Sequence, residues 1–333
     1  MSTLTQFDGS PDTGAAKLVN LQVSNWQVRT GSNSTARAIA WNGTVFAVVT
    51  SISSTNSVMT SPDGITWTSR TAASGSQWGA IAWNGTVFCA VAYSGAGSRV
   101  MTSPDGITWT SRTAAAANDW KAIAWNGTVF VAISDTGSGN RVMTSPTGET
   151  WTSRTSAANS FWAGVAWNGT VFCAVGGGAT GVSDAVMTSP DGITWTSRTA
   201  AANNYWTAIA WNGTLFAVVS ANGSGNRVMT SPDGITWTSR TSAADNEWIA
   251  IAWNGTVFVA TAESGSGNRV MTSPDGITWT IRASANGNYS GIAWNGLGSA
   301  PLYLLPSAGT GTVFVACNSN GSNPMTSLFL KDE

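Results

Sequence analysis

The sequence repeats itself with a period of about 42 residues. The repeating unit reads AIAWNGTVF followed by VMTSPDGITWTSRT, and its Trp-Asn-Gly landmark occurs seven times, at Trp41, Trp83, Trp125, Trp167, Trp211, Trp253 and Trp294. A period of roughly 40 to 45 residues with strand-like chemistry is typical of β-propeller blades rather than of helical solenoids. One repeat buries too little surface to be stable alone, so we expect the repeats to pack on one another around a ring.

Each repeat contains four short apolar runs separated by turn signals, as the segment from Trp120 to Thr155 shows. Asn126-Gly127 predicts a tight type I′ hairpin between the first two runs. Pro-Thr-Gly at 146–148, which is Pro-Asp-Gly in five other repeats, predicts a second hairpin between the last two runs. The inner runs are apolar or small on both faces, which indicates strands covered on both sides. Each repeat is therefore expected to form a four-stranded antiparallel blade.

The two ends of the repeat array are incomplete in complementary ways. Residues 21–30 match the end of a repeat, whereas the last repeat supplies three strands and lacks the fourth. We therefore predict an all-β, seven-bladed β-propeller over residues 18–333, closed by the N-terminal strand that completes the last blade. Trp26 should then lie beside the segment around Met325. Residues 1–17 lie outside the repeat and form an arm, interpreted either as a frayed terminus or as an anchor to a larger assembly.

The two rims of such a ring differ in sequence. The Asn-Gly and Pro-Asp-Gly hairpins belong to one rim, here called the hairpin rim. The opposite rim, the variable rim, holds the blade-to-blade links and the loops Ser51–Ser57, Tyr93–Arg99, Ser134–Arg141, Gly176–Ala185, Ala221–Arg227 and Glu263–Arg269. The last repeat also inserts Leu297–Gly311. Because long loops carry recognition more often than tight turns do, we expect any ligand on the variable rim.

An aromatic residue opens the first strand of most blades on the variable rim. These candidate ligand-binding residues are Trp78, Trp120, Trp162, Trp206, Trp248 and Tyr289, with Ala36 in the first blade. One interpretation is a ring of platforms for sugar faces near the channel mouth. The other is packing between blades, since a large aromatic side chain buries well between sheets.

Composition excludes several classes of function. Charged residues make up 9% of the chain, the net charge is −1 and there is no His, which argues against a nucleic-acid or anionic-membrane footprint. The three cysteines, Cys89, Cys173 and Cys317, occupy one strand position in three blades and are interpreted as small buried hydrophobes. We therefore expect no metal site and no cofactor. No apolar run reaches membrane-spanning length, and the opening residues lack the pattern of a secretory signal peptide.

No catalytic constellation is visible. Catalysis requires a unique arrangement of acids, a nucleophile with its base, or a metal. The carboxylates outside the repeat pattern are scattered over loops: Asp119, Asp135, Asp184, Asp245, Glu247 and Glu263. The sequence therefore favours a protein that is not an enzyme.

The segment Ser103-Pro104-Asp105-Gly106-Ile107-Thr108-Trp109 resembles the Asp-box of sialidase-type propellers, although it lacks one residue between Asp and Gly. In that family the box is structural. The resemblance implies turn-forming rather than catalytic roles for Asp63, Asp105, Asp191, Asp233 and Asp275.

The complete repeat, Trp-Asn-Gly-Thr-Val-Phe followed by Ser-Pro-Asp-Gly-Ile-Thr-Trp, is similar to propeller repeats of bacteriophage virion and tail-fibre proteins. This resemblance implies a non-enzymatic structural protein of the virion, made in the host cytoplasm and exposed on the particle as a fibre or capsid decoration. It would contact other virion proteins through the N-terminal arm or the seventh blade, and host surface glycans through the propeller. The alternatives are a free multivalent lectin, a spacer without a ligand and, least favoured, a glycan hydrolase of sialidase-like fold.

Overall fold

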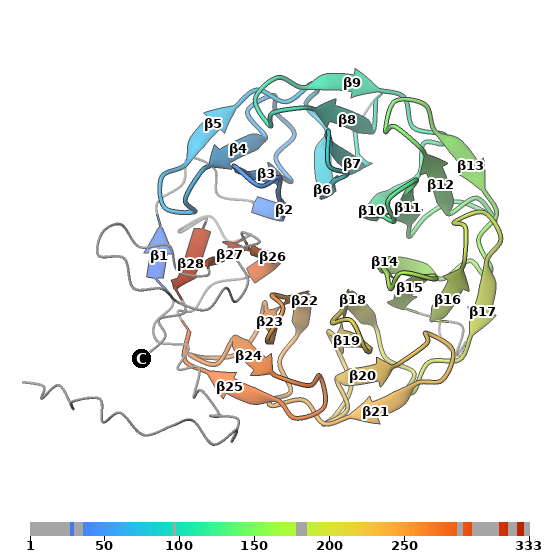
Figure 1. Ribbon diagram of the computed structural model, residues 1–333, viewed down its shortest axis with the longest axis vertical. Helices are drawn as coiled ribbons and strands as arrows, with labels where there is room; N and C mark the ends of the chain where they lie inside the picture. Colours follow the sequence, from blue (N-terminus) through green and yellow to red (C-terminus); the bar gives the residue numbers. More distant parts are fainter. Residues whose placement is uncertain are drawn as a thin grey trace, which may run out of the picture.

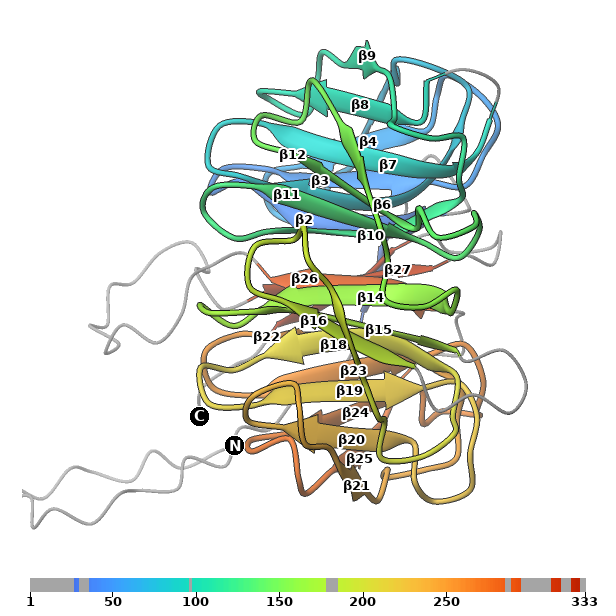
Figure 2. The same ribbon diagram turned by 90° about the vertical axis from the view of Figure 1, so that its right-hand side faces the viewer.

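The computed structural model describes residues 27–29, 36–95, 98–177, 185–284, 289–294, 313–318 and 325–329. Their strands form four-stranded antiparallel sheets arranged in a ring (Figure 1). Within a blade the strands follow one another in sequence, from the innermost strand to the outermost. Figure 2 shows the disc from the side, with the strands crossing its thickness and the loops gathered at the two rims.

Six blades are built from four consecutive strands each. The first three blades are β2 (Ala36–Trp41), β3 (Phe46–Thr50), β4 (Val58–Ser61) and β5 (Thr68–Arg70); β6 (Gln77–Trp83), β7 (Phe88–Ser94), β8 (Val100–Ser103) and β9 (Thr110–Arg112); β10 (Trp120–Trp125), β11 (Phe130–Ser134), β12 (Val142–Ser145) and β13 (Thr152–Arg154). The next three are β14 (Phe161–Trp167), β15 (Phe172–Gly177), β16 (Val186–Ser189) and β17 (Thr196–Arg198); β18 (Trp206–Trp211), β19 (Phe216–Ser220), β20 (Val228–Ser231) and β21 (Thr238–Arg240); β22 (Trp248–Trp253), β23 (Phe258–Ala262), β24 (Val270–Ser273) and β25 (Thr280–Arg282).

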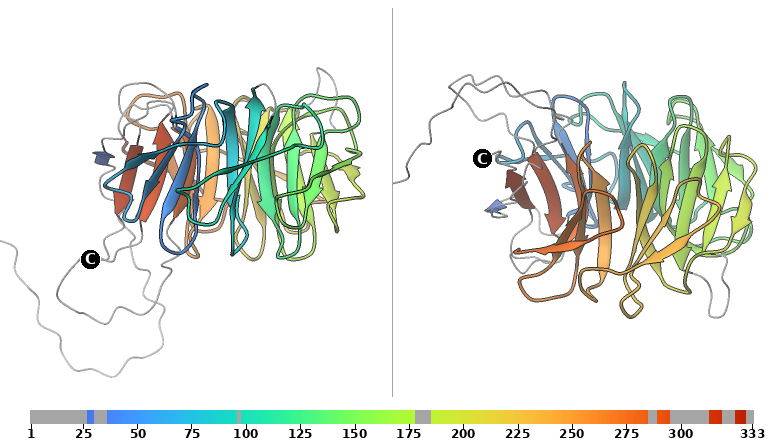
Figure 3. Two further views of the ribbon diagram at one scale, coloured as in Figure 1. Left: turned by 90° about the horizontal axis from the view of Figure 1, so that it is seen from above. Right: turned by 60° about the horizontal axis from the view of Figure 1, so that its bottom comes forward.

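A further sheet combines strands from distant parts of the sequence. It contains β26 (Tyr289–Trp294), β27 (Val313–Asn318) and β28 (Met325–Phe329), and its outer strand is β1 (Gln27–Arg29). β1 pairs antiparallel with β28, with Arg29 opposite Met325. Figure 1 shows this sheet in the ring between the first blade and the sixth, and the right-hand view of Figure 3 shows it from another side.

The prediction of seven blades is corrected to six blades of four consecutive strands each, beside one composite sheet. The structure describes the side-chain packing of those six blades, apart from residues 96–97 and 178–184 in two of their loops. For the composite sheet it gives the backbone register, whereas the side chains of β1, β27 and β28 and all the connecting loops lie outside the described residues. This sheet also departs from the repeat in sequence, because its outer strand precedes the array and an insertion separates β26 from β27. The predicted arm at residues 1–17, Trp26 and the insertion Leu297–Gly311 likewise lie outside the described residues.

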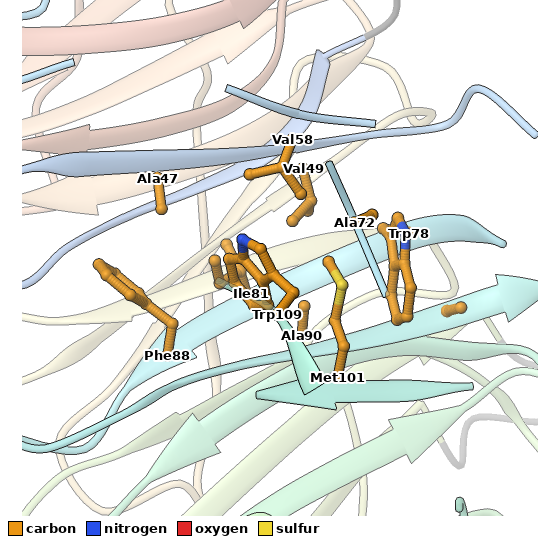
Figure 4. Packing of buried hydrophobic residues seen from close by; sticks show 11 residues of the cluster. Ala47, Val49, Val58, Ala72, Trp78, Ile81, Phe88, Ala90, Met101 and Trp109 are labelled. Carbon is orange, nitrogen blue, oxygen red and sulfur yellow. The ribbon is translucent and has the colours of Figure 1, made fainter. Parts of the chain in front are cut away.

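The core lies between blades. Every residue of β3 and β4 is buried, so both faces of the inner strands are covered. In the cluster shown in Figure 4, Val49 and Val58 of the first blade are buried together with Trp78 and Met101 of the second. The same grouping recurs between the following blades as far as the sixth. Stability therefore depends on neighbouring blades, as a stacked repeat requires.

The Asn-Gly connections differ from the prediction of a tight type I′ hairpin. Trp41 pairs with Phe46, so the loop spans residues 42–45. The side-chain oxygen of Asn42 accepts hydrogen bonds from the N–H groups of Thr44 (2.9 Å) and Val45 (2.8 Å). This Asx-type turn replaces a two-residue hairpin, and the same bonds recur in the next five blades.

Candidate site at the mouth of the central channel

The predicted ring of aromatic ligand-binding residues is buried. Trp78, Trp120, Trp162, Trp206 and Trp248 have an exposed fraction of 0%, and Tyr289 has 1%. No ring face is open to a ligand in this structure, because each tryptophan side chain is enclosed between its own blade and the preceding one. The ligand-binding interpretation is therefore corrected to packing between blades, and Ala36 takes the same buried position in the first blade.

The indole groups also hold the links between blades. Nε1 of Trp120 donates a 3.2 Å hydrogen bond to the carbonyl of Ala116, in the link that precedes it. Trp162, Trp206 and Trp248 make the equivalent bond. Trp78 differs, because its Nε1 is buried without a hydrogen-bond partner.

The residue directly after each of these positions lines the central channel, and we call it the axial residue. From the first blade to the composite sheet the axial residues are Arg37, Gly79, Lys121, Ala163, Thr207, Ile249 and Ser290. Each lies at a register shift between the first and second strands of its sheet. A β-bulge leaves one residue unpaired and re-aims its side chain, here toward the channel. These residues were not predicted from the sequence, although they form one of the most variable columns of the repeat.

At the variable rim, the axial residues surround a cavity of about 190 Å³. Tyr93 and Tyr205 complete its wall. A glycine makes room for each ring: a Cβ atom on Gly79 would lie 3.1 Å from Tyr93, and one on Gly177 would overlap the ring of Tyr205. The absence of a side chain at these glycines thus positions both aromatic rings at the mouth.

Two cations and two carboxylates meet at this mouth. Nζ of Lys121 lies 3.0 Å from Oδ2 of Asp135 and 4.6 Å from the centre of the Tyr93 ring. Arg37 approaches Glu263 only to 3.9 Å. Burial, with the charge of Asp135, raises the pKa of Tyr205, and the charge of Arg37 acts in the opposite direction. Arg37 and Glu263 come from the first and sixth blades and Lys121 and Asp135 both come from the third, and the ring places the two pairs at one mouth.

The other carboxylates named from the sequence do not join this group. Asp119 pairs with Arg99 at 2.7 Å, and Asp245 accepts a 2.7 Å hydrogen bond from the N–H of Gly225. Asp184 lies outside the described residues. No group of three or more His, Cys, Asp or Glu side chains able to hold a metal ion occurs in the described part of the chain.

The loops of the variable rim are more alike than their sequences suggest. Arg141 donates from Nε to the carbonyl of Gly137 (2.8 Å) and from a terminal nitrogen to the carbonyls of Asp135 (2.6 Å) and Ser160 (2.8 Å). Arg227 makes the same three bonds in the fifth blade. These arginines brace the loops and have few donors left for a ligand. In these two blades the same arginine contacts therefore hold loops whose sequences differ.

The Asp side chains of the hairpin rim form turns. Oδ1 of Asp191 accepts hydrogen bonds from the N–H groups of Ile193 (2.8 Å) and Thr194 (3.0 Å) and from the hydroxyl of Ser189 (3.0 Å). The bonds from the Thr194 and Ile193 amides lower the pKa of the Asp191 carboxyl against a smaller opposing effect of burial. Asp63, Asp105, Asp233 and Asp275 make the same contacts. The predicted turn-forming role is confirmed.

Cys89 and Cys173 are free and fully buried. Burial raises the pKa of both thiols far above the ordinary range, so both remain protonated. They act as small apolar side chains, as predicted, whereas the side chain of Cys317 is outside the described residues. Among the described residues no helix is long and apolar enough to cross a membrane.

Four-stranded blades with innermost strands around an axial channel define a β-propeller. No protein-family model matches the sequence, and a search of curated proteins finds no relative. Solved structures share the fold. A catalytically inactive variant of virginiamycin B lyase from Staphylococcus aureus, with quinupristin, is 11% identical with a TM-score of 0.71, over 92% of this chain and 99% of that chain. YCF48 bound to D1 peptide is 14% identical with a TM-score of 0.64, over 92% and 96%. A chain of the mitotic checkpoint complex is 13% identical with a TM-score of 0.65, over 100% and 99%.

These similarities establish the fold alone, and the proteins that share it have varied roles. The resemblance to bacteriophage propellers finds no support among them, so the virion assignment stays a prediction.

Proposed function

We propose that this chain is a non-enzymatic binding propeller that presents the mouth of its channel to a protein partner. One observation carries the proposal: the axial residues differ in every blade, whereas the strands and hairpins around them repeat almost unchanged. A repeated framework with one varied surface is the arrangement expected of a recognition module, because the framework supplies stability and the varied positions supply specificity.

The chemistry of the mouth favours binding over catalysis. Asp135 is paired with Lys121, and Glu263 faces Arg37, so neither carboxylate is an isolated acid or base. The chain has no His to serve as a general base. A nucleophile held by a base does not occur among the described residues of the mouth, where the hydroxyls of Thr207 and Ser290 donate to main-chain carbonyls.

Two propellers of the same fold favour a protein partner. YCF48 is known in a structure bound to D1 peptide, and another propeller is part of the mitotic checkpoint complex. The sequence similarity to virion propellers suggests that this chain is a structural component on the outside of a bacteriophage particle. Its N-terminal arm or its composite sheet would then attach it to other virion proteins.

Crosslinking from the two rims of one blade tests the proposal. A photo-crosslinking residue at Ser224 lies in an exposed variable-rim loop, and one at Thr236 lies in the exposed hairpin of the same blade. In the assembled particle or native cell extract, we expect a defined partner protein to crosslink from position 224 and not from position 236. Equal crosslinking from both rims, or none from either, would contradict the proposal. Normal particle assembly after removal of residues 1–17 would contradict the anchoring role of the arm.

A glycan ligand is the second candidate. Phe161 and Tyr205 remain 45% and 39% exposed on the variable rim, next to buried ring tryptophans. Exposed aromatic faces can stack on sugars, so Phe161 and Tyr205 are the two candidate sugar-binding residues of a lectin. A glycan array with the wild-type chain and with Phe161→Ala tests it, and release of products from capsule polysaccharide would instead indicate a hydrolase.

A further inference from the structure

We propose that the channel mouth binds the carboxylate of an acidic peptide segment between Arg37 and Lys121. The proposal rests on the proposed function, because it names the chemistry by which the protein partner is recognised at the same mouth. The partner would insert one Asp or Glu side chain, or a chain terminus, into the cavity along the axis of the ring.

Arg37 is held differently from the other arginines of the described blades. Arg70 and its equivalents donate from Nε to a threonine hydroxyl of the neighbouring strand, and Arg141 and Arg227 are bound by three carbonyls each. The guanidinium of Arg37 makes no hydrogen bond to a described residue, and its 3.9 Å approach to Glu263 exceeds hydrogen-bonding distance. A guanidinium with unused donors in a fork geometry is suited to bidentate binding of a carboxylate.

The β-bulge fixes where this group points. Ala36 pairs with Thr50 and Ala38 with Val49, so Arg37 is the extra residue of the first strand. Its guanidinium is thereby directed into the channel instead of packing between blades. Because Ala36 and Ile39 of the same strand are buried in the ring, the backbone that carries Arg37 is held in place, which lowers the entropy cost of holding a ligand.

Lys121 supplies the second positive charge. It is the bulged residue of the third blade and lines the same cavity. Asp135 and the face of Tyr93 hold its ammonium group in place, which orients the remaining N–H donors. Asp135 also neutralises part of the charge of Lys121, so the mouth as a whole is not a strongly positive surface. A ligand carboxylate would therefore bind through directed hydrogen bonds more than through long-range attraction.

The size of the cavity favours a single side chain. The cavity at the mouth has about 190 Å³, and a second space of about 190 Å³ lies deeper in the channel and is lined by the same axial residues; each is below the roughly 300 to 1,000 Å³ of pockets that enclose a whole small ligand. A carboxylate side chain fits this space, while the rest of the peptide would cross the rim, where Tyr93 and Tyr205 offer ring surfaces. The hydroxyls of Thr207 and Ser290 already bind main-chain carbonyls, so Arg37 and Lys121 are the main donors.

Ligand-observed NMR titration with matched probes tests the inference. The probes are an acetylated and amidated Gly-Gly-Glu-Gly-Gly peptide, the same peptide with Gln in place of Glu, and glucuronic acid. We expect the Glu peptide to bind at least about tenfold more tightly than the Gln peptide, since a charged hydrogen bond in a partly buried site is worth that factor or more. Arg37→Gln and Lys121→Gln should each weaken binding of the Glu peptide by about tenfold or more. Arg154→Gln, on an outer strand, is the control and should change nothing.

Several outcomes would overturn the inference. They are equal binding of the Glu and Gln peptides, no binding of either, unchanged binding by Arg37→Gln, and Arg37-dependent binding of glucuronic acid alone. Thermal unfolding of each variant checks that the ring is intact, and Arg37→Lys, which keeps the charge and loses the fork, should bind with intermediate strength. Crosslinking from position 224 that persists unchanged in Arg37→Gln would contradict this inference and not the proposed function. Absence of those crosslinks despite tight peptide binding would contradict the proposed function alone.

Discussion

The hydroxyl of Thr207 donates a 2.7 Å hydrogen bond to the main-chain carbonyl of Trp248, in the next blade. Ser290 makes the same bond to the carbonyl of Ala36 and so joins the composite sheet to the first blade. Both donors are axial residues. The position that lines the channel therefore also ties neighbouring blades together wherever it carries a hydroxyl.

Replacing Thr207 by Val should destabilise the fold without changing the shape of the side chain. The variant loses the hydroxyl proton that the carbonyls of Trp248 (2.7 Å) and Val219 (3.0 Å) share. We expect the free energy of unfolding to fall by about 1 to 2 kcal/mol. Denaturant titration measures this change, and Thr207→Ser, which keeps the donor, is the control. A Val variant as stable as the wild type would show that the hydrogen bond between Thr207 and Trp248 does not stabilise the contact between the two blades.

A comparison of Trp78 with Trp120 measures how much the hydrogen bond of the indole N–H contributes to the free energy of unfolding. Both side chains are fully buried, but only Nε1 of Trp120 has a hydrogen-bond partner. Phe in place of either residue removes similar volume, so Trp120→Phe should cost about 1 kcal/mol more than Trp78→Phe. Calorimetric or chemical unfolding of the two variants provides the comparison. The opposite order would mean that Trp78 is the better satisfied residue in solution.

The contribution of the Asp side chains of the hairpin rim to stability can be measured by comparison with the third blade, which has Thr147 at the same position. Asp105 accepts bonds from the amides of Ile107 and Thr108, whereas Thr147, at the same place in the third blade, accepts one bond of 3.3 Å from Glu149. Asp105→Ala should lower the free energy of unfolding by about 1 to 2 kcal/mol, and Thr147→Ala by much less. Equal losses measured by denaturant titration would contradict the assigned role of the carboxylate.

Acid should weaken the hairpin rim first. Main-chain amides, those of Thr194 for Asp191 and Ile235 for Asp233, lower the pKa of each carboxyl in the folded chain. A lowered folded pKa means that this stability is present above the ordinary Asp pKa of about 3.9 and is lost as the pH falls through the folded value. Thermal unfolding of the wild type should therefore shift downward below about pH 4, and Asp191→Asn with Asp233→Asn should shift less. An identical acid response of both proteins would exclude this linkage.

Features set by local chemistry were predictable from the sequence. The period identified the propeller, and Ser-Pro-Asp-Gly identified a turn whose bonds are satisfied within a few residues. The Asn-Gly turn was mistaken because the Asn42 side chain bonds to Thr44 and Val45, which lengthens the loop at the expense of the second strand.

Features that depend on neighbouring blades were not predictable in the same way. Trp120 is buried because it packs against the preceding blade, including Cys89 and Val91 of β7. The sequence of a single repeat does not show how two blades pack on each other. Arg37 and Lys121 escaped notice because a β-bulge, invisible in the alternation of apolar residues, turns them toward the axis. A comparison of the repeats column by column would have singled out this position.

The pairing of β1 with β28 has a consequence for how the ring is made during synthesis. Chains leave the ribosome N-terminus first, and units that are already complete can fold while the rest is still being added. The blades from β2 to β25 can stack in this order, but β1 stays unpaired until β28, the last of the described strands, has been translated. Ring closure is thus a late, post-assembly event, and an interrupted translation product would be an open arc with an unfilled sheet edge.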